Sequence, residues 1–148
     1  MAVTLKEITR ENFEDIISLN VDYEQERFVA SNLYTIAQMQ FKEEKIAKGV
    51  YLNDKAVGLI AYDLEDYDIW RLMIDIKHQG NGYGKKAMEL VLNILRKDNR
   101  LKTARTSINV DNHVMRSLIE GFGFKESGKV LRRFDDGDPE EIEFELKL

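Results

Sequence analysis

The sequence predicts a mixed α/β fold, and two observations support that prediction. An apolar segment at residues 69–76 is followed by a glycine-rich turn, an amphipathic segment and a second apolar segment, which is the pattern of a strand–helix–strand crossover between parallel strands. At the C-terminus, charged and apolar residues alternate strictly from Glu141 to Leu148, as in a half-buried antiparallel strand. The sheet should therefore contain both parallel and antiparallel neighbours.

The N-terminal third is predicted to be mainly helical. A first strand at residues 3–8 precedes a helix for which Thr9 is the expected N-cap. Residues 22–32 are predicted to form a carboxylate-rich helix and loop. A third helical segment is expected from about residue 35 to residue 47.

The rest of the chain alternates between strands and helices. Residues 53–55 form a compact turn between two apolar strands, 50–52 and 56–62, and so predict a hairpin. The acidic residues 63–68 then form a loop before the strand at 69–76, which we expect at the centre of the sheet. The remaining elements are a helix after the glycine turn, a strand at 101–109, a helix at 112–121 that buries Val114, Met115, Leu118, Ile119 and Phe122, a strand at 124–133, a turn at 135–139 and the final strand at 142–148.

Length and composition limit the possible functions. The chain has 148 residues, which suits one domain spanning 1–148. A net charge of −5 argues against a nucleic-acid partner and favours a cationic small molecule, although mild acidity is also the usual way for a protein to stay soluble. With no Cys and only His78 and His113, we expect no disulfide, no cysteine nucleophile and no metal. No long apolar run or signal peptide is present, so we expect a cytoplasmic protein without a membrane partner.

The glycine-rich turn at residues 79–84 has the features of an anion-binding site. Its glycines allow positive φ and let backbone N–H groups converge, and the following helix adds the positive end of its dipole. Lys85 and Lys86 oppose that dipole unless an anion lies nearby, although an ordinary solvated basic turn is the alternative interpretation. The spacing fits neither the nucleotide P-loop nor the dinucleotide-binding fingerprint.

Two motifs resemble a known family. Gln79-Gly80-Asn81-Gly82-Tyr83-Gly84 resembles the Gln/Arg-x-x-Gly-x-Gly/Ala motif of the GCN5-related N-acetyltransferases (GNAT), and the run from Asn112 to Phe124 resembles the family's Asn-x-x-Ala-x-x-Leu-Tyr-x-x-x-Gly-Phe. The order of predicted elements matches as well. The resemblance implies the GNAT fold, with a central mixed, mostly antiparallel twisted sheet, a splayed parallel pair of strands and flanking helices. It also implies an acetyl-CoA-dependent N-acetyltransferase, an acyltransferase.

The resemblance assigns acetyl-CoA, as co-substrate, to particular residues. In the family, the glycine turn binds the pyrophosphate, the exposed backbone of the central strand pairs with the pantetheine arm, and the helix of the second motif contacts the cofactor. The residues in these places are Leu72, Met73, Ile74, Gln79, Gly80, Asn81, Gly82, Tyr83, Gly84, Lys85, Asn112 and Arg116. An N-cap role for Asn112 and a surface position for Arg116 are the simpler alternatives.

The implied reaction is attack of a neutral amine on a thioester. With a reference pKa of about 10.4, neutralising an alkylamine at pH 7 costs roughly 4 to 5 kcal/mol. A carboxylate normally takes that proton, and such help contributes about 10²- to 10⁴-fold in rate. The candidates are Glu24, Glu26 and Asp63, and the sequence does not choose among them.

One position departs from the family motif. The usual tyrosine, often the acid that protonates the departing thiolate, is Ile119 here. Water, Tyr34, Tyr62 or Tyr83 would then serve as the acid, or the protein is a non-catalytic acyl-CoA-binding sensor. If the missing acid limits the rate, Ile119→Tyr is expected to raise it.

For the acceptor, the run from Glu24 to Asn32, with Gln38, resembles the bacterial spermine/spermidine N-acetyltransferases of this family. A polyamine needs carboxylates spaced along a groove with apolar walls, and the acidic residues at 22–26 and 63–68 would supply them. Surface solvation explains the same charges. The alternatives are another small amine, such as an amino sugar or amino acid, and a protein N-terminus. By analogy with the family, a homodimer is a further expectation.

Overall fold

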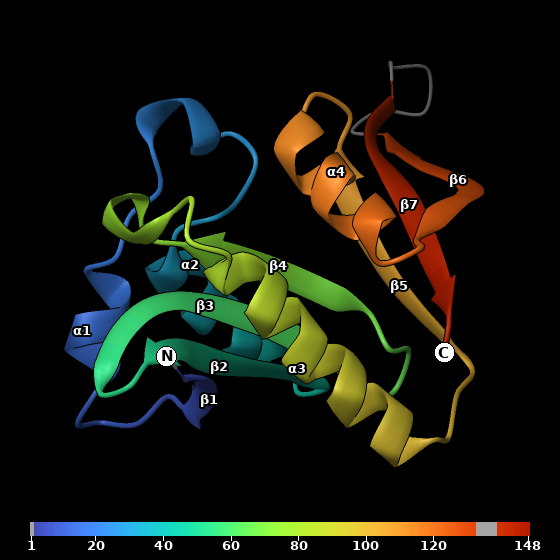
Figure 1. The fold of residues 1–148 in the computed structure, drawn as a ribbon. Coiled ribbons are helices and arrows are strands. Elements are labelled where there is room, and N and C mark those ends of the chain that lie inside the picture. Colours follow the sequence, from blue (N-terminus) through green and yellow to red (C-terminus); the bar gives the residue numbers. More distant parts are fainter. Residues whose placement is uncertain (1, 133–138) are drawn as a thin grey trace.

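The chain forms two antiparallel sheets that meet side by side, with helices on both faces (Figure 1). The structure is a computed structural model that describes residues 2–132 and 139–148. The first sheet has the strand order β1-β2-β3-β4 and the second the order β5-β7-β6. The strands are β1 (Val3–Glu7), β2 (Lys45–Leu52), β3 (Lys55–Asp63), β4 (Ile69–Ile74), β5 (Thr103–Asn109), β6 (Lys125–Arg132) and β7 (Pro139–Lys147). The helices are α1 (Phe13–Ile17), α2 (Asn32–Gln38), α3 (Tyr83–Asp98) and α4 (His113–Gly121), with 3₁₀ turns at Tyr23–Gln25, Met39–Phe41 and Ile76–His78.

The two sheets join through β4 and β5, which run parallel. Among the described residues, the contact is a single bridge between Asp68 and Arg105, reinforced where the Thr106 hydroxyl donates to the Ile69 carbonyl at 2.9 Å. Beyond that point the strands diverge. The mixed, mostly antiparallel fold with a splayed parallel pair is therefore confirmed, and β4 lies at the centre of the molecule although it is the last strand of its own sheet.

Apolar side chains cover both faces of the first sheet. Helix α3 lies across one face and buries Ala87, Met88, Val91, Leu92 and Leu95 in the larger core cluster, which also contains Ile119 of α4 and Phe144 of β7. On the other face, α1 buries Ile16 against Leu59 and Met73. Burying one stripe of each helix in this way holds β4 rigidly between two packed layers.

The predicted helix at 35–47 is wrong in its second half. Helix α2 ends at Gln38, and β2 already begins at Lys45, which pairs with Asp63 across the hairpin. Pairing with β3 along the whole strand outweighs the weak local helical preference of this segment. The hairpin turn itself is confirmed, because Leu52 pairs with Lys55 and Asn53 adopts a positive φ of 54°.

Other boundaries also differ from the prediction. Asn12, not Thr9, occupies the N-cap position of α1, and its side-chain oxygen accepts from the Thr9 N–H at 2.7 Å. The central strand stops at Ile74, because Asp75 turns away and its carboxylate accepts from the Asn20 N–H. Val114 of α4 is 78% exposed instead of buried. The predicted turn at 135–139 falls almost wholly outside the described residues.

Within residues 2–132 and 139–148, no helix is both long and apolar enough to cross a membrane. In the same ranges, His, Asp and Glu side chains form no group of three or more that would hold a metal ion.

Candidate active site

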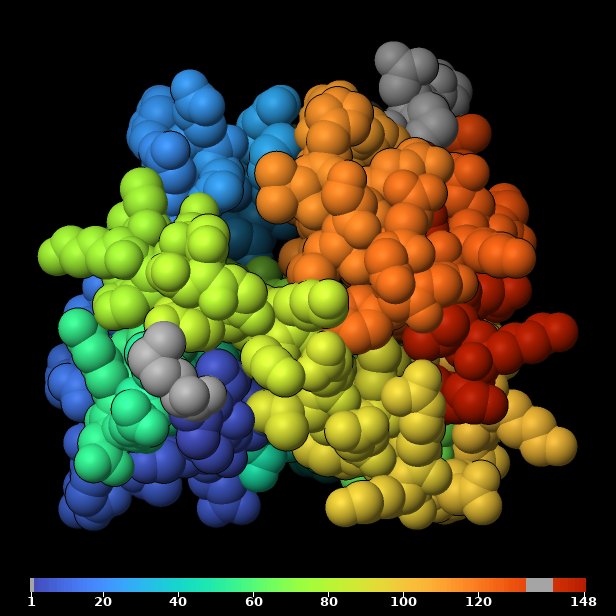
Figure 2. Space-filling model, in the orientation of Figure 1, coloured from blue at the N-terminus to red at the C-terminus, as the bar shows by residue number. Residues whose placement is uncertain are grey.

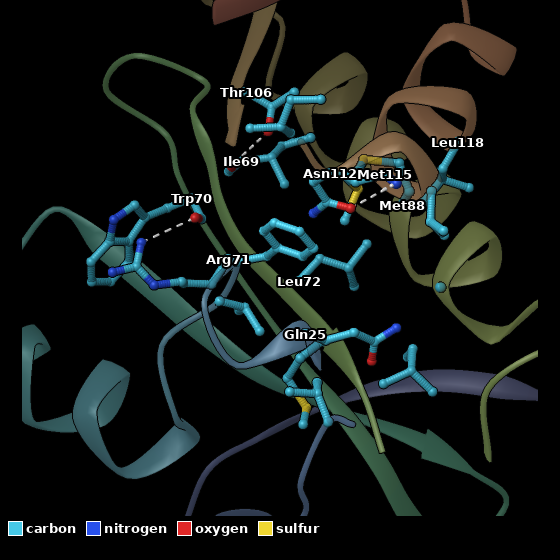
Figure 3. Close-up of a pocket in the computed structure, with 18 of the residues that line it drawn as sticks. Gln25, Ile69, Trp70, Arg71, Leu72, Met88, Thr106, Asn112, Met115 and Leu118 are labelled. Atoms are coloured by element: carbon cyan, nitrogen blue, oxygen red, sulfur yellow. Dashed lines mark hydrogen bonds between the residues drawn. The ribbon is translucent and has the colours of Figure 1, made fainter. Parts of the chain in front are cut away.

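A cavity of about 890 Å³ opens where β4 and β5 diverge. Its walls come from Val21, residues 25–30, β4, the glycine turn, the start of α3, β5 and α4, with Leu131 of β6 and Glu141 of β7. In the space-filling view, the surface is hollowed between the N-terminal segment (blue) and α4 (orange) (Figure 2). Figure 3 shows Trp70 and Arg71 on one side of β4, and Asn112 and Met115 on the other. We call these the acceptor side and the cofactor side.

The glycine turn lines the cofactor side with unpaired backbone donors. Gly80 and Gly82 have φ values of 80° and 81°, which is the left-handed conformation that glycine adopts without strain. Among the described residues, no acceptor pairs with the backbone N–H groups of residues 80–85; the first such bond runs from Lys86 N to Gly82 O. Because α3 is 16 residues long, its dipole adds to these donors, and the turn is suited to a phosphate group.

The outer edge of β4 offers further main-chain groups. Asp75 N donates to Val57 O at 2.8 Å, and hydrogen bonding alternates along an antiparallel pair. Met73 therefore directs its backbone groups toward β3, whereas Leu72 and Ile74 direct theirs toward the gap between β4 and β5. Of the three strand residues predicted to bind the cofactor, Leu72 and Ile74 have this orientation and Met73 does not. The Met73 side chain lies in the core, where its sulfur is 3.4 Å from Asn32 Nδ2.

Gln79 connects the turn to the N-terminal segment. Its Nε2 donates to Ile74 O at 2.9 Å and to Gln25 Oε1 at 2.8 Å, and Gln25 Nε2 returns a bond of 3.3 Å to Gln79 Oε1. These reciprocal amide–amide hydrogen bonds hold the two side chains against each other. The cofactor side and the segment that carries Glu26 are thereby joined.

The two residues of helix α4 and its N-cap that the resemblance assigns to the cofactor lie in different environments. Asn112 lines the cavity, and its side-chain oxygen caps the helix by accepting from Met115 N at 3.2 Å. Arg116 does not line the cavity; it lies 3.5 Å from Glu120 and 3.7 Å from Glu126 and packs over the Phe144 ring. The surface interpretation of Arg116 is the one that this geometry favours.

Ile119 lies in the core and not in the cavity. It is 0% exposed and belongs to the cluster formed with α3 and β7, while its neighbours Met115 and Leu118 line the cavity. Of the tyrosines considered as substitutes, Tyr83 is part of the cavity wall, whereas Tyr34 and Tyr62 are not.

The three carboxylates expected from sequence are in different environments. Glu24 is exposed beside a separate shallow hollow, and Glu26 is exposed at the rim of the cavity. Asp63 is 0% exposed and its carboxylate accepts from Lys45 Nζ at 2.8 Å and from the backbone N–H groups of residues 65 and 66. Both carboxylate oxygens of Asp63 already accept hydrogen bonds, and the residue does not line the cavity. The structure therefore argues against Asp63 as the base.

Two carboxylates that the sequence did not single out line the acceptor side. Asp68 accepts from Lys45 Nζ at 3.1 Å; burial raises the pKa of its carboxyl, Lys45 opposes this shift and Asp63 and Glu143 add to it. Burial also raises the pKa of the half-buried Glu141, against the influence of Arg71. Asp68 belongs to the acidic loop noted in the sequence, whereas Glu141 is indistinguishable there from a solvated strand residue.

Arg71 and Trp70 complete the acceptor side. The guanidinium carbon of Arg71 is 4.0 Å from the centre of the Trp70 ring, and Nη2 donates to Gln38 Oε1 at 3.0 Å. Burial lowers the pKa of Arg71. The acceptor side thus combines an aromatic wall, a cation and carboxylates, while the polar groups of the cofactor side are mainly backbone N–H and C=O groups.

The comparisons with known proteins agree with this geometry. The acetyltransferase (GNAT) family model matches residues 7–124. The spermine/spermidine N(1)-acetyltransferase of Bacillus subtilis (strain 168) is 28% identical over 141 residues, covering 88% of this chain and 92% of that protein. The solved spermidine N-acetyltransferase from Vibrio cholerae, in complex with CoA and spermine, has a TM-score of 0.74 at 17% identity and covers 98% of this chain and 95% of that one.

A second solved structure has a similar relation to the chain. The PaiA N-acetyltransferase from Thermoplasma acidophilum, in complex with coenzyme A, has a TM-score of 0.71 at 17% identity, with 100% of both chains covered. The unpaired N–H groups of the glycine turn and the open edge of β4 fit the phosphates and the amide-bearing arm of acetyl-CoA. The matched family segment includes both sequence motifs. The chain therefore belongs to the acetyltransferase (GNAT) family and is an acetyl-CoA-dependent N-acetyltransferase.

Proposed function

We propose that residues 1–148 form one acetyltransferase domain that acetylates a primary amine of a polyamine such as spermidine or spermine. The observation that carries this proposal is the set of carboxylates that line the cavity, Glu26, Asp68 and Glu141, together with the apolar surfaces of Phe28 and Trp70. Carboxylates recognise ammonium groups, and apolar walls accommodate the methylene segments between them. The names of the Bacillus subtilis relative and of the Vibrio cholerae structure support the same class of acceptor.

On the cofactor side, the proposed roles follow the positions of the main-chain groups. The N–H groups of Gly80, Asn81, Gly82, Tyr83, Gly84 and Lys85 would hold the pyrophosphate, and Leu72 and Ile74 would pair with the pantetheine arm. Gln79 orients the turn, and Asn112 borders the same part of the cavity. Met73 supports β4 from the core, and Arg116 is left out of the proposed set. Acetyl-CoA supplies the activated acetyl thioester.

The test is thiol release from acetyl-CoA, followed with a thiol-reactive dye. The chain contains no Cys, so the protein adds no background signal. We expect saturable thiol release with spermidine and spermine, and weaker release with monoamines of equal length. Binding of acetyl-CoA without thiol release for any amine would contradict the proposal and support the sensor.

Arg71 supports a second candidate acceptor. Its half-buried guanidinium on the acceptor side would bind a carboxylate in a bidentate manner. An amine that also carries a carboxylate, such as an amino acid, fits this cation better than a polyamine does. Including α-amino acids and their decarboxylated analogues in the same panel separates the two candidates, because each pair differs only in the group that Arg71 would bind.

The homodimer expected from the family resemblance stays a prediction. Strands β1 and β6 are the outer strands of the two sheets and have free edges in the described part of the chain. Light scattering after size-exclusion chromatography measures the mass in solution and so tests the expectation.

A further inference from the structure

The side chain of Glu141 projects from the face of its sheet that is opposite the core. On β7, Phe144 and Leu146 are buried, so that residues of opposite parity, including Glu141, project from the other face. The direct cross-strand partners of Glu141 are Asn109 on β5 and Leu131 on β6, which carry no charge. This position places a carboxylate of the second sheet at the cavity whose opposite wall is β4.

The three carboxylates that line the cavity differ in whether their oxygens are free to accept a proton. Glu26 is exposed at the rim, where water solvates it. Asp68 is engaged by the ammonium group of Lys45 at 3.1 Å. Glu141 is half-buried in the cavity wall, and within the described residues no hydrogen bond or close ion pair occupies its carboxylate. Of the three, Glu141 combines burial with free acceptor capacity.

The charged groups that act on Glu141 come from β4, from β7 and from the loop between β3 and β4. They are Arg71 on β4, Asp68 before β4 and Glu140 beside it on β7. Burial raises the pKa of the Glu141 carboxyl, and Arg71 opposes that rise. A base of this kind binds a proton more strongly than a solvated carboxylate does, and the cation of Arg71, which lines the same cavity, favours its ionised form.

We propose that Glu141 accepts the proton from the ammonium group of the acceptor, and that Arg71, which lines the same cavity, is a positioning residue that acts through this carboxylate. The inference rests on the proposed function. In the step, an N–H bond of the ammonium group breaks and the proton moves to a carboxylate oxygen of Glu141. The freed lone pair on nitrogen forms the bond to the thioester carbon, the carbon–sulfur bond breaks, and the thiolate leaves with that electron pair. The nitrogen, which carries a positive charge after the attack, loses its second proton to solvent and becomes the neutral amide nitrogen. Glu141 then returns its proton to the thiolate or to solvent.

The first test is Glu141→Gln, which keeps the shape of the side chain and removes the base. We expect kcat to fall by about 10²- to 10⁴-fold while the dissociation constant of acetyl-CoA changes by less than about twofold. Glu141→Asp, which keeps a carboxylate, should have a kcat between those of Glu141→Gln and the wild type. The matched control is Glu145→Gln, a change on the same face of β7 outside the cavity, for which we expect wild-type rates.

The second test separates a base from a structural residue by its pH dependence. A polyamine amine titrates near pH 10, so a separate acid limb of kcat/KM for the acceptor, well below that pH, reports a group of the enzyme, and it belongs to Glu141 only if Glu141→Gln removes it. Arg71→Met removes the facing cation and should move this acid limb to higher pH, and Arg71→Lys should move it back. Glu141→Gln should abolish the limb.

The outcomes distinguish this inference from the proposed function. Wild-type rates in Glu141→Gln, or an acid limb that Arg71→Met leaves in place, overturn the role of Glu141 while the polyamine acetyltransferase stands. A wild-type protein that binds acetyl-CoA and releases no thiol with any amine overturns both. Circular dichroism of each variant confirms that a lost rate comes from a folded protein.

Discussion

The two sides of the cavity are built from different parts of the polypeptide. The cofactor side uses main-chain N–H and C=O groups from one short stretch, residues 72–85, whose conformation is set locally by glycines. The acceptor side uses side chains of Asp68, Arg71 and Glu141, with Glu26 at the rim, and these come from three segments that lie far apart in the sequence. Backbone recognition tolerates changes of side chain, whereas recognition by converging side chains changes with any one of them. The difference predicts that side-chain substitutions change the affinity for acetyl-CoA little and change the preference among acceptors more.

The largest expected effect concerns the scaffold of the acceptor side. Asp63→Ala leaves Lys45 buried with one carboxylate partner fewer and two backbone N–H groups unpaired. We expect a loss of about 3 kcal/mol in the free energy of unfolding, measured by urea denaturation. Asp66→Ala, a change at an exposed neighbour, should cost much less. If Asp63→Asn instead abolished turnover at unchanged stability, Asp63 would be the base and the assignment to Glu141 would be wrong.

The next effect tests whether the cofactor side depends on backbone conformation. Gly82→Asp places a side chain at a φ of 81° and adds negative charge beside the proposed pyrophosphate. We expect acetyl-CoA to bind about 100-fold more weakly in calorimetry, or roughly 2.7 kcal/mol. The matched control is Gly128→Asp in β6, which has a φ of 95° and equally open space but lies outside the cavity wall. Equal losses of affinity in both variants would show a general effect of folding and not of the turn.

A third prediction replaces the one drawn from the family motif. Because Ile119 is fully buried in the core, Ile119→Tyr must fit a larger polar side chain among Phe124, Phe144 and helix α3. We expect a loss of about 1 to 3 kcal/mol in stability and no gain in turnover. A faster, equally stable variant would restore the account in which a missing acid limits the rate.

The smallest effect concerns the link between the two sides. Gln25→Leu removes the amide pair with Gln79 and leaves the backbone of the glycine turn intact. We expect the KM of the acceptor to rise by about 3- to 10-fold with a smaller change in acetyl-CoA affinity, since one hydrogen bond contributes about 1 kcal/mol. Gln40→Leu, at an exposed position outside the cavity, is the control. Equal changes in both constants would mean that the pair stabilises the turn alone.

Several elements were predictable from the sequence because their signals are local. The crossover through α3, the hairpin at Asn53 and the alternating strand β7 each have a periodicity or turn residue that acts within a few positions. The helix predicted at 35–47 is wrong in its second half because the signal there is not local: β2 gains its stability by pairing with β3. The family resemblance assigns Arg116 to the cofactor, with a surface position as the alternative, and in the structure its guanidinium lies near Glu120 of α4 and Glu126 of β6.

The sequence by itself determined the family motifs, the glycine turn and most of the strands, since backbone conformation there follows from glycine positions and hydrophobic periodicity. Only the tertiary structure decided which carboxylates meet at the acceptor side. The splay of β4 from β5 opens the cavity, and the register of β7 brings Glu141 to its wall while Asp63 is buried against Lys45. Side chains from distant segments converge through packing and strand register. Both depend on residues elsewhere in the chain, so the local sequence around each side chain does not reveal them.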